Sequence, residues 1–201
     1  MIALNPDGPL KILVAYAYIN RGNAFNGKGL YDQAIADVDK GIELSPNQFH
    51  AYFIRGRAYD GKKFYDQAID DYSRAITLNP QAFIAYHNRG AIYSDMGLFN
   101  EALADFDQAI LLNPQDARTY NSRGVVYAKM RQPDRAIIDF ERAIALDLRC
   151  IDAYYNKALF CEITGRMSEA VDAYKKFVEI ATLKYAKQIE HAKQRIAALG
   201  G

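Results

Sequence analysis

Small and apolar residues recur along the chain at the spacing of helices, and each helical stretch is followed by another. Tyr86, Gly90 and Tyr93 stand at positions i, i+4 and i+7, which places them on one face of a helix. A second apolar stripe begins at Ala102, and Gly97 lies between the two at a position that suits a helix C-terminus. The pattern therefore predicts a pair of antiparallel helices joined by a tight turn.

This pair of stripes occurs five times, at a constant interval of 34 residues. In each copy a basic residue precedes a small one, and a tyrosine stands four positions before the small residue. The small residues are Gly22, Gly56, Gly90, Gly124 and Ala158, and the tyrosines are Tyr18, Tyr52, Tyr86, Tyr120 and Tyr154. One helix pair cannot bury its apolar stripe alone, so a fixed period of this length predicts pairs that stack into an array.

These residues resemble the tetratricopeptide repeat family over residues 15–182, because spacing, aromatic positions and small residues agree in successive copies. One departure is consistent: the family usually has leucine where this chain has arginine or lysine. The resemblance implies an all-α fold, a right-handed solenoid of antiparallel helix pairs with a concave face. The expected units are a leader or remnant of an upstream repeat at 1–14, repeats at 15–48, 49–82, 83–116, 117–150 and 151–182, and a capping helix at 183–201.

The two ends of the chain carry further signals. Residues 1–6 echo residues 75–80, the end of a repeat, which fits a chain cut from a longer array. The alternative is a native leader in which Asp7 caps a helix opened by Pro9. Residues 183–199 combine an alanine and isoleucine stripe with lysine and arginine, which predicts an amphipathic helix that caps the array.

Composition narrows the class of protein. Half of the residues are hydrophobic and the formal net charge is +1, which is typical of a folded chain without strong attraction to nucleic acid or acidic membranes. No apolar run reaches the roughly 18 residues of a membrane-spanning helix, and the start lacks the basic region of a secretory signal. We therefore expect a soluble, cytoplasmic protein that binds neither nucleic acid nor membranes.

Motifs for catalysis or metal binding are absent from the sequence, which has no phosphate loop, no HExxH and no paired CxxC. Cys150 and Cys161 would lie about 16 Å apart on one helix, too far for a disulfide, so we expect reduced thiols. His50 and His87 fall on neighbouring first helices without a thiolate or carboxylate partner, so contact with a ligand or solvent is expected rather than a metal. The sequence predicts a non-enzymatic protein without cofactors.

The basic residue before each small residue has a candidate partner. Sixteen positions later the second helix carries an aspartate in four repeats, but Ala173 in the repeat where Lys157 replaces arginine. This shared loss indicates an ion pair, within one repeat or between neighbours, because the planar fork of arginine suits a carboxylate. Ligand binding by the arginines is the alternative. The expected pairs are Arg21–Asp37, Arg55–Asp71, Arg89–Asp105 and Arg123–Asp139.

The family resemblance implies that the first helices line a concave groove with a mixed amide, aromatic and charged surface. The main expected groove residues are Tyr16, Asn20, Asn23, His50, Phe53, Arg57, His87, Asn88, Arg118, Asn121, Lys129, Tyr155 and Asn156, with Ile19, Asn26 and Ile54 also in the lining. Asn20, Asn88 and Asn156 share one position in alternate repeats. Asparagine both donates and accepts, so these residues form a candidate ladder for a peptide backbone; the alternative is a merely solvated face.

The sequence therefore predicts a scaffold that binds an extended protein or peptide segment. Family members that hold the acidic C-termini of heat-shock chaperones use a clamp of lysines, asparagines and an arginine. In the first three repeats, the clamp positions include Ile19, Ile54 and Ile84, so such tails are not expected as partners. An RNA-binding array of the related pentatricopeptide type would run at 35 residues and be more basic, which disfavours RNA.

Self-assembly is the remaining alternative. The first helix of the array has no preceding repeat to cover it, and apolar residues lie at its start. They are Leu10, Ile12, Leu13 and Val14. An adaptor that forms a homodimer through this N-terminal end is therefore a second candidate function.

Overall fold

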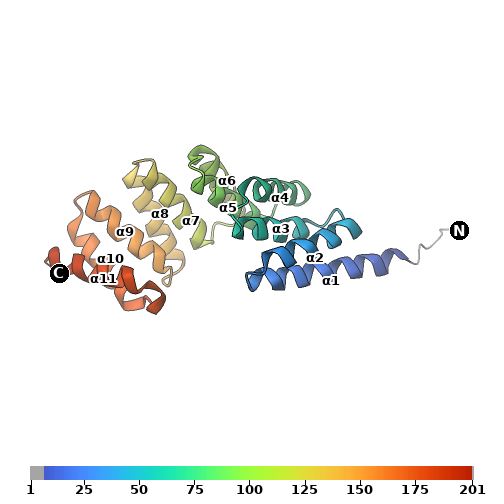
Figure 1. The fold of residues 1–201 in the computed structure, drawn as a ribbon. Coiled ribbons are helices and arrows are strands. Elements are labelled where there is room, and N and C mark those ends of the chain that lie inside the picture. The colour runs from blue at the N-terminus through green and yellow to red at the C-terminus, as the bar shows by residue number, and fades with distance from the viewer. Residues whose placement is uncertain (1–6, 201) are drawn as a thin grey trace. The chain divides into compact units, whose positions relative to one another are not determined.

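The structure is a computed structural model that describes residues 7–200, so the expected repeat-like segment at 1–6 lies outside the described residues. This part of the chain consists of helices and short turns, with no strand (Figure 1). The helices are α1 (Asp7–Gly27), α2 (Tyr31–Leu44), α3 (Phe49–Gly61), α4 (Tyr65–Leu78), α5 (Phe83–Asp95), α6 (Phe99–Leu112), α7 (Ala117–Lys129), α8 (Pro133–Leu146), α9 (Ile151–Ile163), α10 (Met167–Ile180) and α11 (Ala186–Ala198), with a 3-10 turn, η1 (Leu183–Tyr185), before α11.

The chain divides into two compact units, the first ending at Met96 and the second beginning at Gly97. The first contains α1 to α5, and the second contains α6 to α11. Within them, α1 packs on α2, α3 on α4, α7 on α8 and α9 on α10. Gly22 of α1 meets the second helix near Ala34, whereas Gly41 of that helix meets α1 near Ala15, so the two run antiparallel. The predicted all-α fold of helix pairs is confirmed.

A glycine within the first helix lets the two helices approach closely in the pairs α1–α2, α3–α4 and α7–α8. A Cβ atom at Gly22 would lie 2.6 Å from Val38 Cγ2 and 3.1 Å from the carbonyl oxygen of Ala34. At Gly124, a Cβ atom would lie 2.7 Å from Phe140 Cε1. These separations are shorter than ordinary van der Waals contact. The close approach therefore offsets the roughly 1 kcal/mol that a glycine costs inside a helix relative to alanine.

The turn inside each repeat requires one residue in the left-handed backbone region. These residues again recur every 34 positions, and two of them are not glycine. They are Gly29, Lys63, Gly97, Arg131 and Gly165, with φ between 58° and 78°. The sequence pattern identified only Gly97, because it relied on glycine as the marker of a turn. The feature that recurs is the left-handed backbone conformation, which Lys63 and Arg131 also adopt.

The last helices share one core. Cys161, Tyr174 and Phe177 are fully buried, and Ala192 of α11 packs into the same cluster. The helix expected over residues 183–199 begins later, at Ala186, because the chain first forms η1. α11 thus places one apolar side against the core and leaves Lys187 and Lys193 exposed.

Candidate functional site

Arg55 joins its own repeat to the preceding one through a fork of hydrogen bonds. Its Nε and Nη2 atoms donate to the two carboxylate oxygens of Asp71 in α4, over 2.8 and 2.7 Å. Its Nη1 atom donates to Asp39 in α2 over 2.6 Å. The hydrogen bond to Asp71 raises the pKa of the Arg55 guanidinium above its usual range, against the cost of burial. The bridging group is therefore permanently charged.

The fourth repeat has the same arrangement, and the first repeat has its bidentate part. Arg123 of α7 donates to both oxygens of Asp139 in α8, over 2.8 and 2.7 Å, and to Asp107 in α6 over 2.6 Å. Arg21 of α1 donates to both oxygens of Asp37 in α2, over 2.5 and 2.7 Å. These bonds hold the pKa of Asp37 below its ordinary value, although burial opposes the shift.

The carboxylate on the preceding repeat was missed by the sequence reasoning. It lies sixteen residues before the basic residue, at a second polar position that recurs along the chain. That position holds Asp39, Ser73, Asp107 and Glu141. Arg89 donates to Ser73 Oγ over 2.8 Å within the first unit, whereas its expected partner Asp105 belongs to the second unit. The 34-residue period of this polar position is the signal that finds it.

Each arginine also lies near tyrosine rings of its own helix. The Arg55 guanidinium carbon is 5.6 Å from the ring centroid of Tyr52 and 6.0 Å from that of Tyr59. The Arg123 guanidinium carbon is 5.7 Å from the Tyr120 centroid. These distances fit cation–π contacts, which arginine combines with bidentate hydrogen bonding. These internal contacts favour a structural role for the arginines over ligand binding.

In the first unit, most expected groove residues present polar groups to solvent. The exposed ones are Tyr16, Asn20, Asn23, His50 and Arg57. The Tyr16 hydroxyl donates to Gln48 Oε1 over 3.0 Å. Phe53 is half-buried, and its ring centroid lies 5.9 Å from that of Tyr72. Phe53 therefore contributes mainly to packing, and the amides and basic groups contribute the accessible surface.

Charge and amide groups also meet on α3 and α5 of this unit. Burial, and then the nearby carboxylate of Asp95, raise the pKa of Asp60, whereas Arg57 lowers it. Asn88 is half-buried and its Nδ2 atom donates to the Tyr72 hydroxyl over 3.4 Å. His87 is half-buried on the same helix. This face therefore offers both hydrogen-bond donors and a carboxylate.

In the second unit, an amide pair connects two first helices. Asn156 Nδ2 of α9 donates to Asn121 Oδ1 of α7 over 3.1 Å. Each side-chain amide has two N–H donors and an oxygen with two lone pairs, so one shared bond leaves hydrogen-bonding capacity on both. Arg118 and Lys129, also on α7, are exposed basic side chains. In the second unit, the expected groove residues therefore form a polar surface of two amides and two basic side chains.

Tyr155, expected beside a ligand, contacts α11 instead. Its hydroxyl lies 3.1 Å from His191 Nδ1, and its ring centroid is 5.0 Å from that of Phe177. About two turns further along α9, Glu162 accepts from Arg195 Nε over 3.2 Å and from the same guanidinium's Nη2. The sequence did not indicate these contacts, because α11 lies outside the five repeats and its partners follow no period.

Three residues expected in the groove lining are buried instead. Ile19 and Ile54 are 2% and 6% exposed and belong to one apolar cluster. Asn26 is 7% exposed, and its Nδ2 atom donates to the carbonyl oxygen of Ile54 over 2.7 Å. These residues are buried because α1 and α3 contact each other directly. The accessible lining is therefore narrower than the sequence suggested.

Residues 7–200 lack two features of other protein classes. This range holds no cluster of three or more His, Cys, Asp or Glu side chains that could bind a metal ion. Nor does it hold a helix long and apolar enough to span a membrane. Cys150 and Cys161 are free thiols, and burial raises the pKa of both, which keeps them protonated.

Several proteins of known structure have a similar fold. The crystal structure of MamA is 28% identical, with a TM-score of 0.71 over 79% of this chain and 92% of that chain. The structure of pilF from Pseudomonas aeruginosa is 19% identical, with a TM-score of 0.81 over 94% and 90%. YrrB, described as a TPR protein with an unusual peptide-binding site, is 24% identical, with a TM-score of 0.68 over 88% and 90%. No curated protein matches the sequence.

Family models identify the repeats directly. Tetratricopeptide repeat models match residues 15–48, 83–116, 117–149 and 151–182, and a TPR repeat model matches residues 62–97. These matches confirm the resemblance drawn from the tyrosines, small residues and their period. The chain belongs to the tetratricopeptide repeat family.

Proposed function

We propose that this protein is a non-enzymatic interaction scaffold that binds an extended peptide or partner segment along the first helices of its repeats. Protein and peptide binding is the general role of tetratricopeptide repeat proteins, and YrrB is a protein of similar fold with a peptide-binding site. The observation that carries the proposal is the amide pair of Asn121 and Asn156 on neighbouring first helices. Two linked amides with spare donors and acceptors suit the repeating amides of a peptide backbone.

Side chains around the amides would select the ligand. Arg118 and Lys129 favour a segment with acidic side chains near α7. The C-terminal acidic tails of heat-shock chaperones are not the expected partner. When the chaperone-binding clamp is aligned with the first three repeats, two of its positions fall on Ile19 and Ile54. These side chains are buried and apolar, so they cannot bind a carboxylate.

A peptide-display screen against the full chain, followed by calorimetry, tests the proposal. Asn156→Ala should weaken binding of the selected peptide by roughly 1–3 kcal/mol, because a polar group of the ligand loses its partner. Asn100→Ala is the control, since Asn100 is an exposed asparagine on a second helix. Equal affinity for the unmodified chain and for the Asn121→Ala and Asn156→Ala variants would refute backbone capture by these amides.

Self-assembly through α1 is a second candidate function, favoured by a specific observation. Leu10 and Leu13 are 62% and 65% exposed, and Ile12 and Val14 are exposed beside them. If α1 mediates a homodimer, a Leu10→Gln and Leu13→Gln double variant should be monomeric by light scattering. Leu111→Gln, at a leucine of α6 that is 75% exposed, should leave the mass unchanged. A monomeric mass for the unmodified chain across micromolar concentrations would exclude this function.

A further inference from the structure

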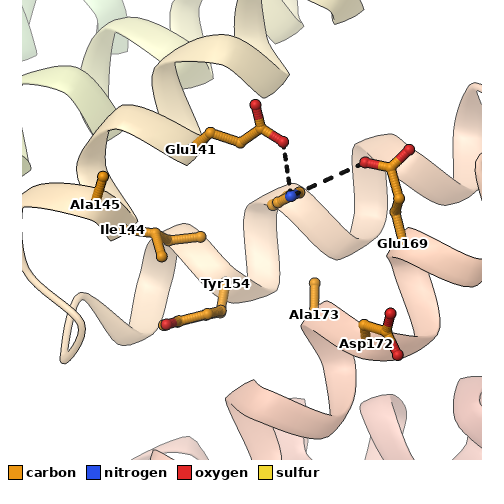
Figure 2. A pocket seen from close by; sticks show the side chains of 8 residues that line it. Glu141, Ile144, Ala145, Tyr154, Glu169, Asp172 and Ala173 are labelled. Atoms are coloured by element: carbon orange, nitrogen blue, oxygen red, sulfur yellow. Dashed lines mark hydrogen bonds and ion pairs between the residues drawn. The ribbon is translucent and has the colours of Figure 1, made fainter.

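A pocket of about 320 Å³ lies between α8, α9 and α10, where the arginine network of the earlier repeats is interrupted (Figure 2). Its lining comes from three helices and combines charged, aromatic and aliphatic groups. The lining residues are Glu141, Ile144 and Ala145 of α8, Tyr154 and Lys157 of α9, and Glu169, Asp172 and Ala173 of α10.

The preceding repeat shows which groups occupy the equivalent space. There the Arg123 guanidinium bonds to Asp139 and Asp107 and lies 5.7 Å from the centroid of Tyr120. A second guanidinium, that of Arg142, lies 5.8 Å from the same ring. The space beside this recurring tyrosine position is therefore occupied by two guanidinium groups in the fourth repeat.

Three of these groups differ in the fifth repeat. Lys157 takes the place of Arg123, so an ammonium replaces the planar guanidinium. Ala173 takes the place of Asp139, so the main carboxylate acceptor is absent. Lys176, at the position of Arg142, bonds to Glu179 over 2.8 and 2.9 Å. The pocket lies beside two of these substituted positions, Lys157 and Ala173.

The charge that remains around the pocket is negative. Three carboxylates line it, those of Glu141, Glu169 and Asp172, against the single ammonium of Lys157. Figure 2 shows Glu141 on one side of the pocket and Glu169 and Asp172 on the other. Lys157 Nζ lies 2.8 Å from a Glu141 oxygen and 4.0 Å from a Glu169 oxygen. The formal charge of the lining is −2, so the pocket favours a cation.

We propose that this pocket binds the guanidinium group of an arginine side chain presented by a partner protein. A guanidinium would restore the group that the earlier repeats place beside the tyrosine, with carboxylates around it and an aromatic ring in the wall. Its planar fork can bond to two carboxylates, and it stacks on an aromatic ring more readily than a strongly hydrated ammonium does. Glu169 and Asp172 stand at i and i+3, on one face of α10, as such a contact requires.

This site is separate from the proposed peptide-binding amides. Tyr154 and Lys157 lie on a different side of α9 from Asn156 and Leu159, because neighbouring positions of a helix are rotated by about 100°. Changes in the pocket should therefore leave the affinity of a peptide bound at Asn121 and Asn156 unchanged. Failure of one proposal does not imply failure of the other.

The test uses the ¹⁵N-labelled full chain, titrated with N-acetyl-arginine methylamide at low ionic strength. We expect saturable shifts of the Ala145, Lys157 and Ala173 amide signals. The uncharged isostere N-acetyl-citrulline methylamide should give none, and the lysine analogue should bind more weakly. Asp172→Asn should lower the affinity for the arginine probe by about threefold or more, as expected for an exposed charge pair. Asp134→Asn, which alters an exposed carboxylate outside the pocket, should not.

A double variant, Lys157→Arg with Ala173→Asp, provides the decisive control. It recreates the arginine and aspartate of the fourth repeat, so the chain's own guanidinium should fill the pocket and abolish probe binding. The proposal is overturned if the arginine probe gives no saturable shift. It is equally overturned if citrulline or lysine binds as tightly, or if the double variant binds the probe as well as the unmodified chain does.

Discussion

At the residue scale, one arginine contacts two carboxylates of very different burial. The Asp139 side chain is 4% exposed, whereas that of Asp107 is 57% exposed, and Arg123 bonds to both. The buried carboxylate has exchanged water for the guanidinium, but the exposed one keeps most of its hydration. The contribution of the arginine to stability should therefore come mainly from the contact with Asp139.

Replacement of these two aspartates separates the contributions. Asp139→Ala leaves Arg123 without its buried partner, and we expect the free energy of unfolding to fall by about 3 kcal/mol. Asp107→Ala should cost at most about 1 kcal/mol, because the lost pair is exposed to solvent. Both residues belong to the second unit, so urea denaturation can compare the two variants directly. Equal losses would contradict the structural role assigned to the buried fork.

The close approach at the glycines gives a second residue-scale prediction. In Gly22→Ala, the new Cβ atom would meet Val38 Cγ2 at 2.6 Å and the Ala34 carbonyl oxygen at 3.1 Å. We expect a loss of about 1–3 kcal/mol from overpacking. Gly8→Ala, on the same helix with no atom within 4 Å of the new Cβ, should instead be neutral or stabilising by up to about 1 kcal/mol. Thermal melts that rank the two variants in the reverse order would refute close packing at Gly22.

At the element scale, α11 is attached to α9 by a titratable contact. Arg195 donates two hydrogen bonds to Glu162, and these hold the pKa of Glu162 below its ordinary value. Because the folded-state pKa is depressed, the contact stabilises fully above the unfolded pKa of about 4.3. Its contribution is lost as the pH falls through the lower folded-state value.

The corresponding prediction compares Glu162→Gln with the unmodified chain. The variant should have a lower melting temperature at pH 6, and the difference should shrink as the pH falls below about 4.3, because the glutamate of the unmodified chain then becomes protonated. Glu101→Gln, at an exposed glutamate of α6, should show no such convergence. A difference that stays constant from pH 6 to pH 3 would show that Glu162 does not act through its charge.

The elements themselves differ in how well the sequence predicted them. Tyrosine and glycine at fixed phase were sufficient to predict the helix pairs, because a stripe at helical spacing can be buried in only one way. Lys63 and Arg131 show the limit, since a left-handed turn without glycine leaves no local signal. The contacts of Tyr155 and Glu162 with α11 were also missed, because they depend on tertiary packing beyond the last repeat.

At the scale of the whole molecule, the repeat period predicted the family but not the accessible surface. Ile19 and Ile54 fall at groove positions of the family and are nevertheless buried, because direct contact between α1 and α3 covers them. The pocket at Lys157 and Ala173 was foreshadowed by their joint departure from the arginine and aspartate pattern. Its volume and its charge became evident only with the positions of Glu169 and Asp172.

The central claim is that the first helices bind an extended segment of a partner. The most direct measurement is a map of amide chemical-shift changes in the ¹⁵N-labelled full chain, saturated with a peptide selected by display. The account predicts that the largest changes fall on the side-chain amides of Asn121 and Asn156 and on the backbone near Arg118. Changes confined to the second helices α6, α8 and α10, with both asparagine amides unmoved, would contradict it.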